Sequence, residues 1–355
     1  MNKKLLAVAI SSALAAPMAA QAIEASVSGH VNRAITFVDD GTASDWSSVD
    51  NMASQSRLRV VGSGDLGMGG MKVGTVMEWG FSSNRSSGIT IKGRNGNTAG
   101  GDLNPNLRHS RLFFSGSWGK VTMGHGSGAF DGTAYYGDQG GSVFLAGIEN
   151  GTATHAGGVA FRTANGAAAG HTVGQAFGTL DGGRYDNIRY DSPKLGPLGV
   201  AIDLGDNQRY SVAATLSTKF SGASVKAKIG YEDNENDGGY DQWGLSAGVL
   251  FSQGTNITVA YADRDDGGND PSSFYVKLGH RWGPNRVNSV AIDYIQLDDR
   301  RAAGSESTSW GIGFAHDIPG PKVQLYTGYR NWDLDIAGAN IDDVDGFNLG
   351  ARVRF

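Results

Sequence analysis

The sequence predicts an all-β fold: a single transmembrane antiparallel β-barrel of about 16 strands with a long third external loop folded inward. Three observations predict this fold. Apolar and polar side chains alternate with a period of two along most segments, aromatic residues lie at both ends of the apolar faces, and short turns alternate with longer polar segments. No long window places apolar residues at helical spacing, so strands are the regular structure that we expect.

Composition excludes several classes of protein. The chain has 355 residues, of which 55 are glycine and only 8 are proline, and its formal net charge is −5. Abundant glycine without proline and without a tripeptide repeat argues against collagen and against proline-rich disorder. The chain has no cysteine, which excludes disulfides and thiolate metal sites. The negative charge argues against a nucleic-acid partner.

The N-terminus has the pattern of an export signal. Lys3 and Lys4 precede an apolar run, and Ala20-Gln21-Ala22 resembles a cleavage site. We therefore expect residues 1–22 to be removed and residues 23–355 to form the barrel. A short N-terminal helix or an anchor is the alternative, but the apolar run is too short to span a bilayer. No later stretch approaches a transmembrane helix in length.

The first observation, the alternation, separates two faces on each strand. In residues 209–220 the apolar positions are Tyr210, Val212, Ala214, Leu216 and Phe220, and polar residues lie between them. At the C-terminus, Phe347, Leu349, Ala351, Val353 and Phe355 share one face, and Asn348, Gly350, Arg352 and Arg354 share the other. Successive side chains of a strand point to opposite faces, so the two faces meet different surroundings.

The second observation concerns aromatic residues, which bracket the apolar faces. The brackets are Tyr210 with Phe220, Trp243 with Phe251, Phe274 with Trp282, and Phe347 with Phe355. Eight to ten residues tilted by roughly 40° rise about 20–25 Å, which matches the apolar band of an outer-membrane barrel between its aromatic girdles. A soluble sandwich would bury its aromatic residues in the middle of its strands instead.

The third observation concerns the connections. Seven short turns occur, at residues 64–69, 115–120, 192–199, 220–224, 252–256, 282–285 and 318–322. Polar and mostly longer segments lie between them, including residues 39–51, 232–239 and 263–273. Seven turns at one end imply about sixteen strands, and a barrel of that size encloses an aqueous channel. Closure is required in lipid because no backbone group can remain unpaired there.

The longest connection, residues 126–184, is rich in glycine and alanine and is too apolar for a freely solvated loop. A loop of this length inside a compact fold is usually functional. We expect it inside the barrel, with Asp131, Asp138 and Glu149 facing the wall. An additional external subdomain is the alternative.

No motif predicts an enzyme, a cofactor or a metal site. Residues 62–67 match a dinucleotide-binding pattern, but a strand follows where a helix is needed. Residues 233–238 lack the closing glutamate of a calcium loop. The seven histidines are scattered, and no nucleophile elbow occurs.

In several segments, the sequence resembles the general diffusion porins of Gram-negative outer membranes. The residues that carry the resemblance are 27–37, 56–79, 108–131, 187–193, 195–204 and the terminal Phe355. The resemblance implies a homotrimer of sixteen-stranded barrels in the outer membrane, in contact with lipids and lipopolysaccharide and with both termini periplasmic. It also implies that Phe355 is read by the barrel-assembly machinery.

The resemblance further implies a constriction where basic wall residues face loop carboxylates. Its matching positions are Arg57 in the second strand, Arg111 in the fourth, His30 in the first and Arg189 near the sixth; Arg59 shares the parity of Arg57. The acidic side comprises Asp131, Asp138 and Glu149. An arginine facing lipid would cost about 2–4 kcal/mol near the midplane, so these arginines face water. Lumen solvation without any filtering role is the alternative.

We therefore expect a water-filled channel for passive diffusion of small hydrophilic solutes and ions, and no enzyme activity. The alternatives are a substrate-selective channel for anions or oligosaccharides, a barrel enzyme, and an adhesin or receptor. The sign of the ion selectivity stays open. Lys226, Lys228, Lys277 and Arg281 favour a basic interior, whereas Glu78, Asp203 and Asp317 oppose it.

Overall fold

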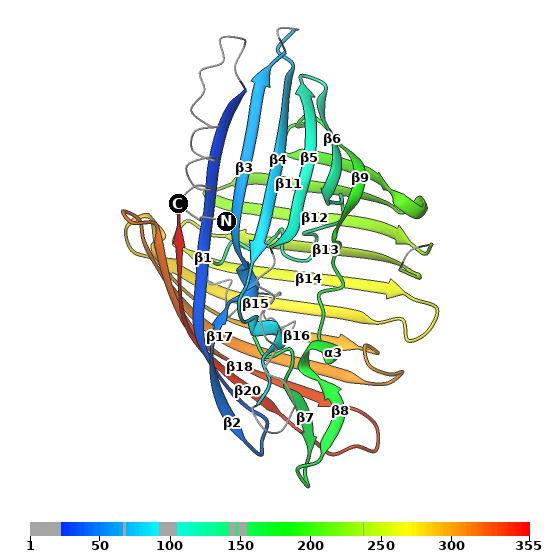
Figure 1. The fold of residues 1–355 in the computed structure, drawn as a ribbon, viewed down its shortest axis with the longest axis vertical. Coiled ribbons are helices and arrows are strands. Elements are labelled where there is room, and N and C mark those ends of the chain that lie inside the picture. Colours follow the sequence, from blue (N-terminus) through cyan, green and yellow to red (C-terminus); the bar gives the residue numbers. More distant parts are fainter. Residues whose placement is uncertain (1–22, 67–68, 92–104, 142–146, 148–154, 237) are drawn as a thin grey trace, which may run out of the picture.

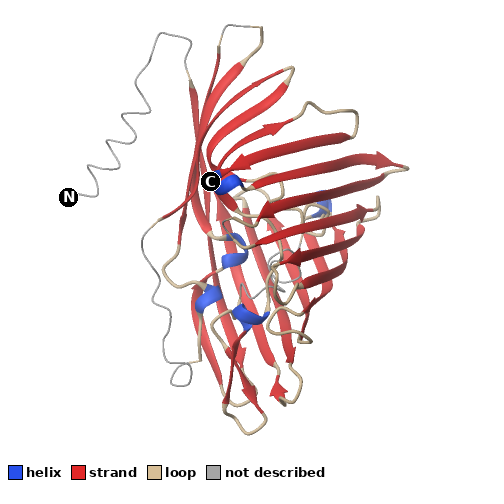
Figure 2. Ribbon diagram, turned by 90° about the vertical axis from the view of Figure 1, so that its right-hand side faces the viewer, coloured by secondary structure: helices blue, strands red, loops and turns tan. Residues whose placement is uncertain are grey.

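The computed structural model describes the chain except for residues 1–22, 67–68, 92–104, 142–146, 148–154 and 237 (Figure 1). The expected signal peptide, residues 1–22, lies outside the described residues. Strands dominate the described part of the chain, and Figure 2 shows the few short helical turns beside a large curved sheet. Within that part, no helix is both long and apolar enough to cross a membrane.

One antiparallel sheet of 17 strands forms the barrel. Its strands are β1 (Glu24–Asp39), β2 (Ser44–Asp50), β3 (Ser56–Asp65), β4 (Lys72–Phe81), β5 (Asn106–Gly116), β6 (Gly119–Ser127), β9 (Arg184–Asp191), β10 (Leu198–Gly205), β11 (Tyr210–Phe220), β12 (Ala223–Asn234), β13 (Tyr240–Leu250), β14 (Thr255–Asp265), β15 (Ser272–Trp282), β16 (Asn288–Asp298), β17 (Glu306–Ile318), β18 (Val323–Asp335) and β20 (Val344–Arg354).

The barrel is closed, with sixteen strand positions. The first strand, β1, pairs with the last, β20, from His30↔Arg354 to Asp39↔Asp345. Two strands share the other edge of β1: β3 pairs with residues 24–30 and β2 with residues 33–39. β2 and β3 therefore occupy one strand position between them, which confirms the expected closed barrel of about sixteen strands.

The strand faces differ as the alternation predicts. All eight bracketing aromatic residues of the sequence analysis are exposed on the outer face, with exposed fractions from 36% for Phe251 to 76% for Phe220. Aromatic rings lie side by side there: the centroids of Trp243 and Tyr261, on the adjacent strands β13 and β14, are 5.4 Å apart, and those of Trp282 and Phe314, on β15 and β17 at either side of β16, are 6.1 Å apart. The intervening side chains point inward and are largely polar. The outer face is thus an apolar band with aromatic margins.

The seven predicted turns all join neighbouring strands at one end of the barrel, from β3–β4 to β17–β18. We call this the short-turn end, and the opposite end the long-loop end. One prediction needs correction: residues 44–50, assigned to a polar connection, form β2. In β2, Trp46 is 60% exposed on the outer face while Val49 is buried, so its alternation continues the barrel face.

The terminal residue closes the short-turn end. The backbone N–H of Phe355 donates to the carbonyl of Gly29 at 3.0 Å, and the N–H of Gly29 donates to the carbonyl of Phe355 at 3.1 Å. A Cβ at Gly29 would lie 2.7 Å from the phenyl ring, so glycine is needed for this approach. The role of Phe355 as an assembly signal stays a prediction.

Candidate functional site

The connection between β6 and β9 comprises residues 128–183, and we call it the inward segment. Its described residues, 128–141, 147 and 155–183, lie along the inner face of the barrel. Its first part follows β10 to β13. The backbone N–H groups of Phe130 and Gly137 donate to the hydroxyls of Ser211 (3.0 Å) and Ser246 (3.1 Å). Both serines belong to the inward-facing set of their strands and are buried. The first part of the segment therefore lies inside the barrel, as the sequence predicts.

Small residues bring this backbone directly against the wall. A Cβ at Gly248 of β13 would collide with the carbonyl oxygen of Gly137. Likewise, a Cβ at Gly137 would lie 2.6 Å from the carbonyl carbon of Ala247. Glycine at both positions removes the side chains that would hold the two backbones apart.

Further along, the segment forms a buried ion pair with β15. The Nζ of Lys277 lies 2.8 Å from the Oδ2 of Asp138, and both side chains are almost inaccessible (0% and 7% exposed). Asp138, predicted to face the basic wall across the channel, is thus engaged with its own side of the barrel. Its charge is neutralised there.

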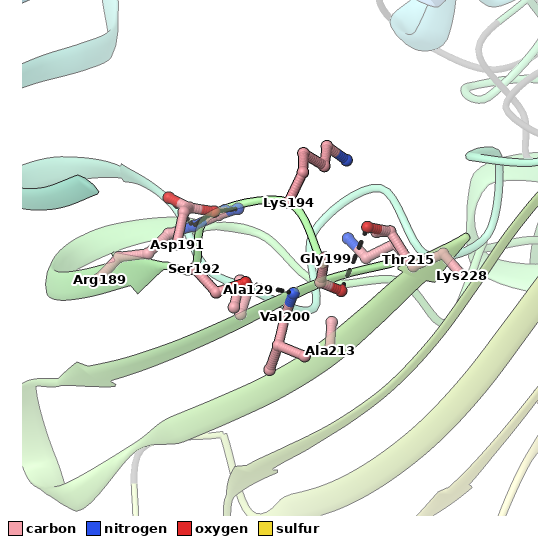
Figure 3. Close-up of a pocket in the computed structure, with 11 residues that line it drawn as sticks. Ala129, Arg189, Asp191, Ser192, Lys194, Gly199, Val200, Ala213, Thr215 and Lys228 are labelled. Atoms are coloured by element: carbon pink, nitrogen blue, oxygen red, sulfur yellow. Dashed lines mark hydrogen bonds and ion pairs between the residues drawn. The ribbon is translucent and has the colours of Figure 1, made fainter. Parts of the chain in front are cut away.

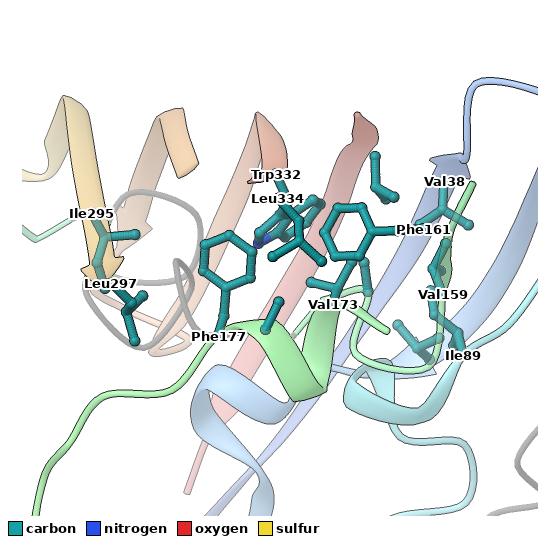
Figure 4. Close-up of a cluster of buried hydrophobic side chains, with 14 of the residues drawn as sticks. Val38, Ile89, Val159, Phe161, Val173, Phe177, Ile295, Leu297, Trp332 and Leu334 are labelled. Atoms are coloured by element: carbon teal, nitrogen blue, oxygen red, sulfur yellow. The ribbon is translucent and has the colours of Figure 1, made fainter. Parts of the chain in front are cut away.

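The second part of the inward segment, residues 156–177, is anchored by apolar contacts. It contains β7 (Ala160–Thr163), β8 (Ala168–Thr172) and the one-turn helix α3 (Val173–Ala176). Its apolar side chains join one buried cluster with inward-facing residues near the long-loop ends of β16, β18 and β20 (Figure 4). The cluster includes Val159, Phe161, Val173, Phe177, Ile295, Leu297, Trp332, Leu334 and Val344.

Polar contacts fix the same part of the segment. The Nε of Arg162 lies 2.7 Å from the Oδ2 of Asp40, and both side chains are buried (6% and 0% exposed). A second sheet orders β19 (Ile341–Asp342), β7 and β8, and so joins the segment to the last long connection. The inward segment therefore covers the inner wall from β10 round to β1.

The sector from β3 to β6 carries a cluster of cations around one carboxylate. Glu78 of β4 is 3% exposed and contacts three arginines. Its oxygens lie 2.7 Å from the Nε of Arg108, 3.1 Å from the Nη1 of Arg59 and 3.5 Å from the Nη1 of Arg57. Three guanidinium groups on one carboxylate leave a net charge of about +2.

A β-bulge explains how Arg108 reaches this cluster. Glu78 pairs with His109, but the next residue of β4, Trp79, pairs with Leu107. Arg108 is therefore the extra residue of β5. Strict alternation from Arg111 would turn Arg108 outward, and the bulge turns it inward instead.

The remaining predicted basic residues also face the lumen. Arg111 shares the inward parity of His109, and within the described chain no hydrogen bond or ion pair engages its guanidinium. Arg189 forms an ion pair with Asp191 at 2.6 Å. His30 of β1 pairs directly with Arg57 of β3, and its Nε2 lies 3.3 Å from the carbonyl of Ser54. We call Arg57, Arg59, Arg108, Arg111 and Arg189 the basic wall.

The inward segment carries a further carboxylate besides the expected Asp131 and Asp138. Asp181, near the end of the inward segment, accepts backbone N–H groups from Gly132 (3.0 Å) and Thr133 (3.0 Å). It thus ties the two ends of the segment together, and it lies close enough to Asp131 for their charges to interact. Glu149 lies outside the described residues.

Sequence reasoning missed Glu78 as the centre of the basic wall, and it missed Arg108 and Asp181. The parity of Glu78 with inward-facing residues was visible, but its three partners come from two other strands. Among the described residues, no group of three His, Asp or Glu side chains is arranged to hold a metal ion.

The family model for Gram-negative porins matches residues 6–337 of this chain. The chain belongs to the Gram-negative porins. It therefore forms an outer-membrane channel for passive diffusion, and its family and fold are those of a channel rather than an enzyme.

Solved structures support the same fold for this porin. An anion-selective porin from Comamonas acidovorans is 17% identical, with a TM-score of 0.62 over 94% of this chain and 99% of that one. The channel DcaP of Acinetobacter baumannii is 14% identical, with a TM-score of 0.59 over 96% and 100%. The trimer form of OmpT from Vibrio cholerae is 13% identical, with a TM-score of 0.57 over 94% and 100%. A search of curated protein sequences gave no match to this porin.

Proposed function

We propose that this porin is a general diffusion channel whose constriction lies between the basic wall and the inward segment, and that the constriction prefers anions. The cluster around Glu78 carries the proposal, because three arginines share a single carboxylate and keep a net positive charge. Arg111 adds a further cation without a partner among the described residues. Cations lining a narrow water column raise the local concentration of anions.

The carboxylates of the inward segment oppose this charge only in part. Asp138 is neutralised by Lys277. The carboxylate of Asp181 accepts backbone N–H groups, and Lys228 of β12 lies near both Asp131 and Asp181. Cations therefore exceed anions at the constriction. The transverse field between the two sides orients dipolar solutes and penalises apolar ones.

The proposed assembly follows from the fold and the relatives. We place the short-turn end and both termini in the periplasm, and the long loops at the cell surface next to lipopolysaccharide. The trimer form of OmpT supports a homotrimer for this porin. Barrel insertion by the assembly machinery, with Phe355 as its signal, belongs to the same proposal.

The charges of the wall can be tested by reversal potentials in planar bilayers. Arg57→Ala and Arg111→Ala should each lower the anion-to-cation permeability ratio by about fivefold, because one charge at roughly 5 Å contributes about 1 kcal/mol in water. Recordings at about 0.1 M salt are needed, since the screening length falls to roughly 3 Å at 1 M.

The matched control for these variants is Lys219→Ala, which removes one positive charge from the exposed short-turn end of β11. It should leave the ratio unchanged. If both arginine variants keep the wild-type ratio, the basic wall is not the filter.

A further inference from the structure

A recess opens between the start of the inward segment and the wall formed by β9 to β12 (Figure 3). Its volume is about 180 Å³. Three cationic side chains line it, each from a different element: Arg189 from β9, Lys194 from the β9–β10 turn and Lys228 from β12. Asp191 and the hydroxyls of Ser192 and Thr215 complete its polar lining. We call it the cationic recess.

The cations of the recess retain hydrogen-bond donors. Within the described chain, the ammonium group of Lys194 has no hydrogen-bond or ion-pair partner, so its three N–H groups are available. The Nζ of Lys228 donates to the carbonyls of Asp131 (2.7 Å) and Phe130 (3.4 Å), which leaves one N–H.

Arg189 is held in place by its other contacts. Its Nε donates to both oxygens of Asp191 (3.1 and 3.2 Å), its Nη2 donates to Oδ1 (2.6 Å), and its Nη1 donates to the carbonyl of Gly128 (2.8 Å). A second Nη1 bond reaches the carbonyl of Ser127 at 3.3 Å. One N–H on Nη2 remains of the five that a guanidinium carries.

The charge of the recess favours an anion of more than one charge. Three cations against the single carboxylate of Asp191 leave a net charge of about +2, and that carboxylate is already bound by Arg189. Outside the lining, Arg111 and Lys120 lie within electrostatic range of Arg189, and Asp131 and Asp181 lie within range of Lys228, so the excess positive charge is that of the lining itself. No second carboxylate is available in the lining to hold a cation.

We propose that the cationic recess binds a small tetrahedral oxyanion with two charges, the chemical class of inorganic phosphate and sulfate. The inference rests on the proposed anion preference and names the solute class. Donors on three elements surround the space, and a tetrahedral oxyanion offers acceptors in several directions at once. The bound ion lies at the short-turn side of the inward segment, beside the path along the basic wall, and exchanges with ions in that path.

The test is calorimetric titration of inorganic phosphate into the full-length mature porin in detergent, at about 0.15 M ionic strength where charges act over only roughly 8 Å, so that nearby charges outside the recess contribute little. The wild type should show saturable binding. Lys194→Gln should weaken the affinity at least tenfold, because it removes the recess cation that has no other described partner. Sulfate should compete with phosphate for the site.

Lys226→Gln is the matched control. Lys226 lies on the same inward face of β12, two residues before Lys228, but does not line the recess. This variant removes the same charge from the lumen and should change the affinity by less than twofold. Absence of saturable binding, or equal weakening in both variants, would overturn the site in favour of a diffuse attraction of anions.

Conductance in potassium chloride separates this proposal from the channel itself. The Lys194→Gln porin should still give open-channel conductance steps. A failed phosphate titration with intact conductance steps therefore contradicts only the binding of an oxyanion in the recess. A porin that gives no conductance steps contradicts the proposed channel function instead.

Discussion

Glu78→Gln should make the channel more anion-selective, raising the anion-to-cation permeability ratio by about fivefold. The amide has nearly the shape of the carboxylate, and its oxygen can still accept from Arg108 and Arg57, while one negative charge and the contact to Arg59 are lost. The cluster then changes from a net charge of about +2 to about +3, and a charge at this range contributes about 1 kcal/mol in water. Reversal potentials in a gradient of dilute potassium chloride measure the ratio.

The matched control for Glu78→Gln is Glu235→Gln. Glu235 is exposed in the connection between β12 and β13, and its replacement changes the net charge by the same amount. It should leave the ratio unaltered. Equal shifts in the two variants, or a shift towards cations in Glu78→Gln, would show that Glu78 does not set the charge of the constriction.

Phe161→Asp should release the second part of the inward segment and raise the single-channel conductance by roughly half or more. Phe161 is completely buried among Val159, Trp332 and Leu334 in the cluster that holds this part against the wall. Losing a buried phenyl ring costs about 3–5 kcal/mol, and the buried carboxylate adds a further penalty. The apolar contacts of Phe161 are separate from the backbone hydrogen bonds that join the barrel strands. The barrel itself should therefore remain folded.

Two readouts separate the outcomes for Phe161→Asp. Conductance reports the width of the path, and limited proteolysis reports whether residues 160–172 have become accessible. Phe161→Leu keeps an apolar anchor and should match the wild type in both. Accessible residues with unchanged conductance would show that this part does not narrow the path, and continued protection would show that the apolar cluster does not hold it.

The barrel could be predicted from the sequence because lipid imposes a strict pattern on each strand. The seven short turns predicted about sixteen strand positions. Period-two alternation and the aromatic margins predicted which side chains of those strands face outward. The segment of residues 39–51 was assigned wrongly because its polar residues conceal a short alternating run around Trp46. A strand that extends above the membrane has no need of a long apolar face.

The inward segment and the constriction could be predicted only in outline. Its length and apolar content indicated a place inside the barrel, and the arginines were found by their parity. The pairing of Asp138 with Lys277 joins residues far apart in the chain, and the inward turn of Arg108 depends on a bulge. Neither contact leaves a local signal in the sequence, since both depend on the register between strands.

The central claim is that water runs along the basic wall inside a closed barrel, while the outer face of the same strands meets lipid. Single cysteines test it directly because the chain has none of its own. Arg59 of β3 and Met77 of β4 lie on opposite faces of neighbouring strands, with similar exposed fractions of 37% for the Arg59 side chain and 38% for Met77. In liposomes, a charged, water-soluble thiol reagent should modify Arg59→Cys and reduce its current, and should leave Met77→Cys unmodified. Equal reaction at the two positions, or no reaction at Arg59→Cys, would contradict the account.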